Sequence, residues 1–405
     1  MPTYLFHLGR EPGLSIAEIE SLFTAERIPG EEPCLVGHAL EISTPEGLDP
    51  RGVIARLGGT IRIAEKIASL DPGVSAGEAA EAIFNEIRRR TKAEERKFSF
   101  GLSYAGSARS RWSPDLEEIA KTVKEMARKE GLSVRFILPR KGQSLSGAQV
   151  EENGLIGRGV EFLLSSGESG VVLGRTVAVQ GFQEDADRDM QKPDRRVYEG
   201  LLPPKLARIL VNLSRRPDTR SLIDPFCGSG VLLIEALALG LDVYGVDRDT
   251  GALEASRRNL EWFSERARVQ GKYRLRPGDS RNLSEYFKPL SIDAAATEPD
   301  LGPPLRRPLS FDQAKEAAAG LRDLYARVLA ELRIVLKPGS RCTFITPIFM
   351  TDRGPFPVSI ERDLTVIGYR TWEPVWKVKG AEGHKELVHR RPGQKVARRI
   401  HLLEA

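Results

Sequence analysis

Short apolar runs alternate with longer amphipathic stretches through the second half of the chain. Residues 221–224 form an apolar run too short for a helix, residues 231–239 an apolar helix, and residues 243–246 a second strand. The pattern continues with expected helices over 206–213, 250–269 and 311–336 and strands over 273–275, 292–296, 341–345, 364–367, 375–378 and 394–403. Alternating strands and helices predict a parallel sheet with helices on both faces.

The first half mixes helices and strands in another order. Strands are expected over 4–6, 34–36, 39–42, 98–104, 134–138, 171–173 and 176–179, and helices over 14–23, 51–57 and 76–90. The clearest helix of this half follows Ser113, which is expected to cap it, with Pro114 in its first turn and Gly131 at its end. The pattern predicts a small α+β region.

Composition bounds these expectations without deciding them. The 405 residues suggest two or three domains, and the net charge of +5 is compatible with a nucleic-acid partner. The three cysteines are far apart in sequence, so neither a C-x-x-C metal site nor a disulfide framework is indicated. No signal-peptide core and no membrane-spanning run is expected, and a cytoplasmic location fits.

The stretch Asp224-Pro-Phe-Cys-Gly-Ser-Gly230 is the most informative in the chain. Glycines in a turn between a strand and a helix let the backbone approach a ligand. A dinucleotide-binding turn needs a small residue three positions after Gly230, and Leu233 stands there. The alternative is S-adenosylmethionine, which has no pyrophosphate and needs glycines beside its amino-acid end. An unspecialised glycine-rich turn remains the third possibility.

Acidic residues follow three successive predicted strands. Asp247 ends the second strand, where an acid can accept two ribose hydroxyls. Asp279 follows the third, where an acid can accept from an adenine amine while the backbone N–H of Ser280 donates to the ring. Glu298 and Pro299 follow the fourth. Lone Gly-Asp pairs and proline-rich segments are also ordinary turns.

Residues 224–230 resemble motif I of the N-methyltransferases that act on amino groups of nucleic acids, and Thr297-Glu-Pro-Asp-Leu-Gly302 occupies the position of their motif IV, (D/N)-P-P-(Y/F). In that motif an acid or amide and a proline-turn carbonyl accept the amine hydrogens, while an aromatic residue stacks on the flipped-out base. Here Asp300 and Leu301 replace the second proline and the aromatic residue. Leu301 offers no π-face, which weakens the expectation of base stacking.

The order of motifs in the first half resembles the THUMP-domain tRNA guanine-N2 methyltransferases. The matching segments are Tyr4–Gly9 with Leu14–Ile19, Phe100–Gly106, Leu145–Leu155 and Gly174–Gln180, followed by Arg188-Asp189, Lys192-Pro193 and Gly200–Ala207. The resemblance implies a ferredoxin-like module over 1–68, a THUMP RNA-binding domain over 69–182, a linker over 183–200 and a Rossmann-like, seven-stranded class I methyltransferase domain over 201–405. It also implies tRNA as the partner.

The candidate residues divide between cofactor and acceptor. The cofactor-binding candidates for S-adenosylmethionine are Asp224, Pro225, Cys227, Gly228, Ser229, Gly230, Asp247, Arg248, Asp279 and Ser280. The catalytic candidates are Glu298, Pro299, Asp300 and Gly302. The reaction expected is SN2-like methyl transfer to an exocyclic amine of tRNA, most simply guanine N2. No metal is expected, since His384 and His389 have no third ligand in view.

Basic residues cluster in three places. They are Arg88, Arg89, Arg90, Lys92, Arg96 and Lys97; Arg135, Arg140 and Lys141; and His384, Lys385, His389, Arg390, Arg391, Lys395, Arg398 and Arg399. Each cluster could contact phosphates or only face solvent. Two rival functions stay open: a tRNA-binding relative that has lost turnover, and a DNA amino-methyltransferase. Sulfur transfer is disfavoured because no PP-loop is found. A monomer is favoured, with the oligomeric state unknown.

Overall fold

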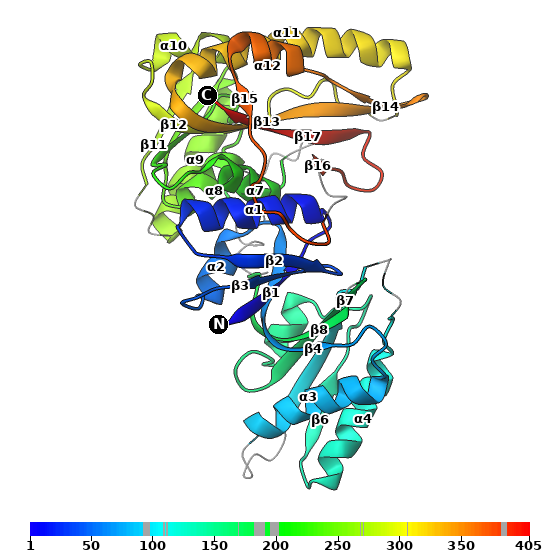
Figure 1. Cartoon of the computed structure of the whole chain (residues 1–405). Helices are drawn as coiled ribbons and strands as arrows, with labels where there is room; N and C mark the ends of the chain where they lie inside the picture. The colour runs from blue at the N-terminus through cyan, green and yellow to red at the C-terminus, as the bar shows by residue number, and fades with distance from the viewer. Residues whose placement is uncertain are drawn as a thin grey trace.

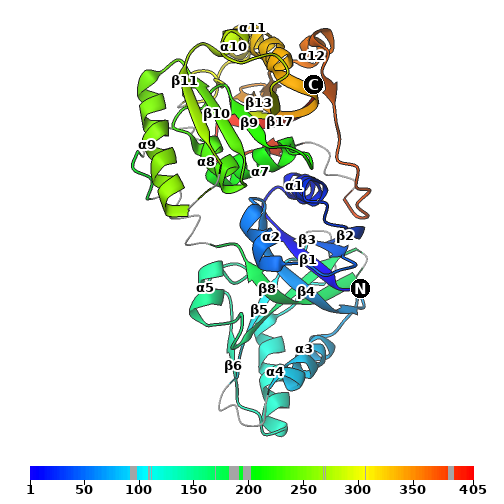
Figure 2. The same ribbon diagram turned by 90° about the vertical axis from the view of Figure 1, so that its left-hand side faces the viewer.

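The computed structural model describes residues 1–91, 98–107, 110, 112–168, 170–181, 191–194, 202–267, 269, 271–305, 307–381 and 387–405. These residues form two halves arranged end to end, each built around its own sheet (Figures 1 and 2). Several residues singled out in the sequence lie outside the described ranges: Lys92, Arg96, Lys97, Arg188, Asp189, Gly200, Leu201, His384 and Lys385.

The C-terminal half contains the predicted parallel sheet. Its strand order is β11 (Tyr273–Pro277), β10 (Asp242–Asp247), β9 (Ser221–Asp224), β12 (Ile292–Thr297), β13 (Leu336–Thr351), β17 (Val396–Glu404) and β15 (Arg370–Thr371). β17 runs antiparallel to both of its neighbours, β13 and β15, whereas β9 to β13 pair in parallel. Along this path the predicted seven strands with one antiparallel strand are confirmed, and the whole sheet has nine strands. Short strands β14 (Gly354–Pro357) and β16 (Val388–His389) add to β13 and β17.

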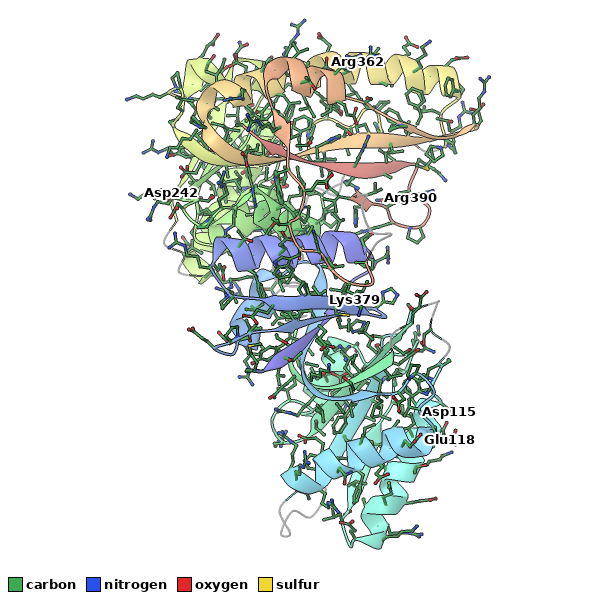
Figure 3. All side chains as sticks on the ribbon, viewed as in Figure 1. Asp115, Glu118, Asp242, Arg362, Lys379 and Arg390 are labelled. Atoms are coloured by element: carbon green, nitrogen blue, oxygen red, sulfur yellow. The ribbon has the colours of Figure 1, made fainter. Side chains whose placement is uncertain are left out.

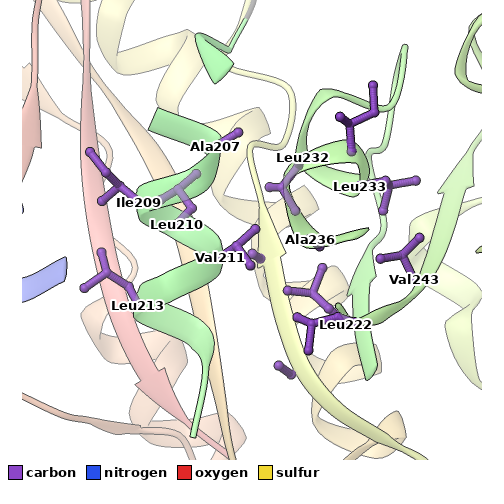
Figure 4. Packing of buried hydrophobic residues seen from close by; sticks show 14 of the residues in the cluster. Ala207, Ile209, Leu210, Val211, Leu213, Leu222, Leu232, Leu233, Ala236 and Val243 are labelled. Carbon is purple, nitrogen blue, oxygen red and sulfur yellow. The ribbon is translucent and has the colours of Figure 1, made fainter. Parts of the chain in front are cut away.

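Helices cover both faces of this sheet. Leu222 packs in one apolar cluster with α7 (Pro204–Ser214), α8 (Val231–Ala238) and α9 (Thr250–Ala267). Ile223, the next residue along β9, packs in a second cluster with α10 (Leu283–Tyr286), α11 (Phe311–Val335) and α12 (Glu361–Ile367). Alternate strand residues thus fill two cores, as the period-2 geometry of a strand requires. Figure 4 shows the first of these cores, where α7 and α8 meet the strands.

Two of the expected closing strands are wrong. Residues 364–367 belong to helix α12, whose left-handed C-cap Gly368 ends it. Residues 375–378 lie in no strand. The short strand β15 lies between them. Apolar residues in these segments pack against neighbouring helices and against the other half, so their apolar character was not evidence for sheet pairing.

The N-terminal half forms one eight-stranded sheet. Its order is β2 (Glu31–Val36), β3 (Ala39–Ser43), β1 (Thr3–Leu8), β4 (Thr60–Leu70), β8 (Gly170–Val179), β7 (Val160–Gly167), β5 (Phe98–Tyr104) and β6 (Val134–Ile137). The helices of this half are α1 (Pro12–Ala25), α2 (Pro50–Arg56), α3 (Ala76–Arg90), α4 (Leu116–Lys129) and α5 (Gly147–Glu152). Pairing of β4 with β8 joins the first four strands to the last four.

Three expectations for this half need correction. Strands β4 and β7 were not predicted. β4 carries charged residues along its length, and the apolar and polar residues of β7 do not alternate. The two strands expected over 171–179 are a single strand, β8. Helix α4 is capped by Asp115, which accepts hydrogen bonds from the N–H groups of Glu117 and Glu118, and not by Ser113 (Figure 3). An aspartate two residues later is an equally good cap, so composition alone could not choose.

A polar seam joins the two halves where α1 lies against α7. The buried Glu18 carboxylate accepts from the N–H groups of Gly58 and Gly59 at 2.7 Å each, and from Asn212 Nδ2 on α7 at 2.9 Å. Asn212 Nδ2 also donates to the carbonyl of Arg56 at 2.8 Å. Burial raises the pKa of Glu18 to about 7, against the lowering effect of these donors. Satisfied buried polar groups of this kind fix one arrangement of the halves.

A second connection is the segment 372–381, here called the strap, which follows β15 and crosses to the N-terminal half. Trp376 packs edge-on against Phe23 of α1, with ring centroids 5.5 Å apart. The N–H groups of Val375 and Trp376 both donate to the Glu20 carboxylate. Lys379 bridges to β2 through the N–H of Leu35 (Figure 3). The chain then returns through β16 to β17.

Candidate active site

The glycine turn after β9 is built as the sequence predicts. Gly228 has φ 50° and Gly230 has φ 83°, backbone conformations that suit glycine. The N–H of Gly230 donates to the carbonyl of Cys227 at 2.8 Å, which closes the turn, and Gly230 is the N-cap of α8. Leu233, the residue that argued against a dinucleotide, is fully buried against β10 beside Gly245.

Asp247 faces this turn from the end of β10. Its Oδ2 accepts from the N–H of Gly228 at 2.8 Å, and its Oδ1 accepts from the N–H of Asp249 at 2.9 Å. Each oxygen of an ionised carboxylate can accept more than one hydrogen bond. The two backbone donors therefore fix the orientation of the carboxylate and leave lone pairs for hydroxyl groups of a ligand.

A cleft of about 520 Å³ lies at the carboxyl edge of the sheet. Its lining includes Pro225, Asp247, Arg248, Asp279, Ser280, Glu298, Pro299 and Asp300 from the candidates, together with Phe226, Gly278, Arg281, Gly320, Asp323 and Leu324. Ligands of open parallel sheets bind at this edge. The structure thus brings candidates for both cofactor and acceptor into one cavity. The remaining candidates lie in the adjoining segments and are not among the lining residues: Asp224, Cys227, Gly228, Ser229, Gly230 and Gly302.

Asp279 follows β11 and caps a short 3-10 turn over Ser280–Asn282. Its carboxylate pairs with the guanidinium of Arg281, with Nε 3.0 Å from Oδ1. Hydrogen bonding to Arg281 lowers the pKa of Asp279. The Tyr286 hydroxyl accepts from the N–H of Asp279 at 3.2 Å, which ties the turn to α10. An ionised, partly exposed acceptor stands at the position predicted for adenine recognition.

Glu298 and Asp300 lie on the turn that follows β12. The Glu298 carboxylate is largely buried and forms a two-pronged ion pair with Arg398 of β17, with Nη2 3.2 Å from Oε1 and Nε bound to Oε2. Burial raises the pKa of Glu298, and the Arg398 guanidinium opposes that shift. The carbonyl of Asp300 accepts from the Tyr325 hydroxyl at 2.5 Å, and its Oδ1 accepts from the N–H of Gly302 at 2.9 Å. The turn is rigidly held.

Leu301 does not line the cleft. Its side chain packs against the apolar cluster that contains α7 and α8. The position that would be aromatic in motif IV therefore contributes to the core. Phe226, from the glycine turn, is the aromatic side chain among the lining residues described for the cleft. Sequence reasoning missed Phe226 because it treated the turn as a cofactor loop alone.

Part of the chain is similar to proteins of known family. The UPF0020 family model, described as an RMKL-like methyltransferase domain, matches residues 193–350. Residues 193–350 are therefore similar to the methyltransferase domain of that family. The tRNA (guanine(10)-N2)-dimethyltransferase of Pyrococcus abyssi is 35% identical over 151 residues, which is 37% of this chain and 41% of that protein. The enzyme of that name from Methanocaldococcus jannaschii is 34% identical over 140 residues, 33% of this chain and 39% of that protein.

The matches thus span about two fifths of each relative's length. A solved structure, TrmN from Thermus thermophilus, aligns with 99% of this chain and 99% of its own, with a TM-score of 0.56 and 18% identity. At that identity the likeness shows a shared fold, and it extends over both halves of the molecule.

Cysteine is absent from the described residues that line the cleft. Cys227 is buried, and burial with the neighbouring carboxylates of Asp224 and Asp247 raises the pKa of its thiol well above the usual range. A thiol is nucleophilic as the thiolate. Asp224 is also buried, where burial raises its pKa to about 7. It accepts from the Thr297 hydroxyl at 2.7 Å and from the N–H of Phe226 at 3.1 Å, so it ties the glycine turn to β12.

The polar groups around the cleft are compatible with S-adenosylmethionine. Asp247 offers carboxylate oxygens that backbone N–H groups orient, Asp279 and the Ser280 N–H stand at the next strand end, and a Cβ at Gly228 would meet nothing within 4 Å. In the part of the chain that the structure describes, no group of three His, Cys, Asp or Glu side chains could hold a metal ion. No helix among the described residues is long and apolar enough to cross a membrane.

Sequence reasoning missed the partners that hold the site together. Arg398 is 100 residues from Glu298, and Tyr325 lies in the middle of a long helix. Arg398 stood out only as one of a basic cluster. Its alternation with the buried Ile400 and Leu402 on one face of β17 is the signal that could have marked it.

Proposed function

We propose that this chain is an S-adenosylmethionine-dependent methyltransferase that methylates the exocyclic N2 amine of a guanosine in tRNA. The observation that carries the proposal is the cleft in which Asp247, Asp279 and Glu298 meet at one sheet edge. The similarity of this domain to enzymes named as tRNA guanine(10)-N2-dimethyltransferases supports the acceptor.

Three parts of the cleft bind different parts of the cofactor. The Asp247 carboxylate accepts the ribose hydroxyls, Asp279 and the Ser280 N–H read the adenine, and the turn from Asp224 to Gly230 borders the amino-acid end. Pro225, Cys227, Ser229 and Arg248 complete this binding region. When bound, S-adenosylmethionine supplies a methyl group on a positively charged sulfur, which is an electrophile for in-line attack.

The turn at Glu298 and Pro299 binds and orients the amine that accepts the methyl group. An aromatic amine is a weak nucleophile because its lone pair is delocalised into the ring. A carboxylate and a backbone carbonyl that accept its two N–H groups turn the lone pair toward the methyl carbon and hold the proton that must leave after transfer. Asp300 and Gly302 keep the turn in shape. Positioning of two bound reactants accounts for most of the rate enhancement expected.

We further propose that residues 1–182 bind the tRNA, divided into a ferredoxin-like module over 1–68 and a THUMP domain over 69–182. Exposed Arg88, Arg89 and Arg90 end α3, and exposed Arg135, Arg140 and Lys141 lie on β6 and just after it. Each cation that meets a phosphate releases a counterion, so binding should weaken steeply with salt.

Methyl transfer to bulk tRNA tests the proposal. The purified protein is incubated with unmodified tRNA and S-adenosylmethionine carrying a labelled methyl group, and nucleosides are then analysed by mass spectrometry. We expect label in N2-methylguanosine or N2,N2-dimethylguanosine, with position 10 examined first. Glu298→Ala should lose at least about 100-fold in rate.

Three outcomes would contradict it. Label only in N6-methyladenosine would overturn the guanine assignment. Label in DNA and not in tRNA would favour the DNA amino-methyltransferase. Tight tRNA binding without label, across many tRNAs, would favour a binding protein that has lost turnover.

A further inference from the structure

Arg398 is the least expected charged residue in the catalytic half. It lies in the interior of β17 with only 3% of its side chain exposed, and its partner Glu298 is 13% exposed. Two N–H groups of one guanidinium reach the two oxygens of one carboxylate. Such a fork fixes the plane of the carboxylate as well as its position. Burying two charges is costly, so a pair that serves packing alone gains little over apolar residues.

The strand that carries Arg398 is itself anchored to the N-terminal half. β16 pairs with β17 so that His389 lies opposite Arg398. His389 Nδ1 is 3.3 Å from Glu11 Oε1, at the residue that precedes α1, and the two side chains are 13% and 25% exposed. Glu11 also accepts from the backbone of Arg390. Glu11 of the N-terminal half thus contacts the hairpin that carries Arg398.

The chemistry of the pair has a consequence for the base. A carboxylate bound by a guanidinium only accepts hydrogen bonds, whereas a protonated acid or an amide also donates one. Guanine presents two donors side by side, N1–H and the N2 amine. Adenine presents its N6 amine beside N1, which is an acceptor. An acceptor-only carboxylate is complementary to the guanine edge and meets a lone pair at adenine N1.

We propose that Arg398 is a positioning residue that clamps Glu298 as an acceptor-only carboxylate, so that Glu298 binds the N1–H and N2 edge of guanine; this rests on the proposed function. Arg398 acts through Glu298 and does not touch the base. The clamp also explains how a glutamate serves where a shorter side chain is usual, because the fork removes the freedom that the extra methylene adds.

Conservative replacement separates a clamp from a packing role. Arg398→Lys keeps the charge but cannot form a planar fork. We expect kcat for tRNA methylation to fall about 10- to 100-fold, as for other supporting residues around a reactive group, with KM for tRNA, the Kd for S-adenosylmethionine and the Tm little changed. The matched control is Arg399→Lys on the next position of β17, whose partner is Glu361 at 2.9 Å on the opposite face. That variant should retain wild-type kcat.

A modified acceptor tests the base-reading part. A tRNA is assembled with 2-aminopurine at the mapped target position; this base keeps the C2 amine and has a lone pair at N1. The wild type should methylate it at least 10-fold more slowly than guanosine. Glu298→Gln, whose amide can donate to N1, should narrow that preference although its absolute rates are low. An unchanged preference would overturn the assignment of Glu298 to the N1–H edge.

The remaining outcomes are also decisive. Arg398→Lys with kcat within about twofold of wild type, or with kcat lost only in proportion to a lowered Tm, would overturn the clamp. If the wild type methylates an adenosine amine, the proposed function fails, and the clamp is judged by the kcat of Arg398→Lys on that substrate. If the wild type methylates no amine in tRNA or DNA, both proposals fall.

Discussion

The two glycines of the turn after β9 differ in one measurable respect. A methyl group added at Gly228 would meet nothing within 4 Å. The same group at Gly230 would lie 2.5 Å from Ser256 Oγ and 3.3 Å from Ser256 Cβ, on α9. Both glycines have positive φ. In Gly228→Ala the expected loss of stability comes from backbone strain alone. In Gly230→Ala it comes from backbone strain and from a steric clash with Ser256.

The left-handed conformation costs a non-glycine residue about 1–2 kcal/mol, which is the whole loss of stability expected for Gly228→Ala. Gly230→Ala should lose about 1–3 kcal/mol more, because overpacking displaces neighbours that are already in contact. The Ser256 hydroxyl is buried and has no hydrogen-bond partner among the described residues, so it can rotate away cheaply. Its Cβ cannot. Ser256→Ala combined with Gly230→Ala should recover only the part due to the hydroxyl.

Urea unfolding measures the stabilities, and calorimetric titration with S-adenosylmethionine measures binding. Gly228→Ala should weaken binding more than its small loss of stability suggests, since the proposed function puts the cofactor against this turn and a strained φ would shift the Gly228 N–H that orients Asp247. Equal stabilities for the two variants would refute the clash at Ser256. Unchanged binding in Gly228→Ala would refute the placement of the cofactor against this turn.

Three further variants test burial at the site and at the strap. Burial raises the pKa of Asp224 from 3.8 to about 7. The contribution of Asp224 to stability is therefore fully present below about pH 4 and is lost as the pH rises through 7. Asp224→Asn cannot ionise, so its free energy of unfolding should fall less than that of the wild type between about pH 5 and pH 8. An equal fall in both proteins would contradict this. Trp376→Ala should lower stability by about 2 kcal/mol because the indole packs on Phe23, whereas Val375→Ala, at a side chain 78% exposed, should change it by less than about 0.5 kcal/mol.

Much of the C-terminal half was predictable because its order is local. The short apolar runs over 221–224, 243–246, 273–275, 292–296 and 341–345 lie in strands, and the acids that follow the second, third and fourth of them lie at the same edge of the sheet. Asp247, Asp279 and Glu298 meet there for that reason, although they are spread over 52 positions of sequence by number. The glycine turn was predictable for the same reason, since its φ values depend on residues that adjoin one another.

The contacts that order the site from outside were not predictable in this way. Arg398 pairs with Glu298 only because an antiparallel strand, placed last in sequence, lies beside β13. A strand was predicted over 375–378 because Val375, Trp376 and Val378 are apolar. The residues that this segment contacts lie more than 300 positions earlier in the sequence. Asn212 donates a hydrogen bond to Glu18 across the seam, and no sequence pattern in either helix predicts this contact.

The family match ends at residue 350, and everything that holds Glu298 from outside begins after it. Residues 372–381 dock on α1 and β2, β16 brings His389 to Glu11, and β17 brings Arg398 to Glu298. The segment that carries Arg398 therefore contacts the proposed RNA-binding half before it reaches the cleft, because the strap and His389 lie on the same stretch of chain as Arg398.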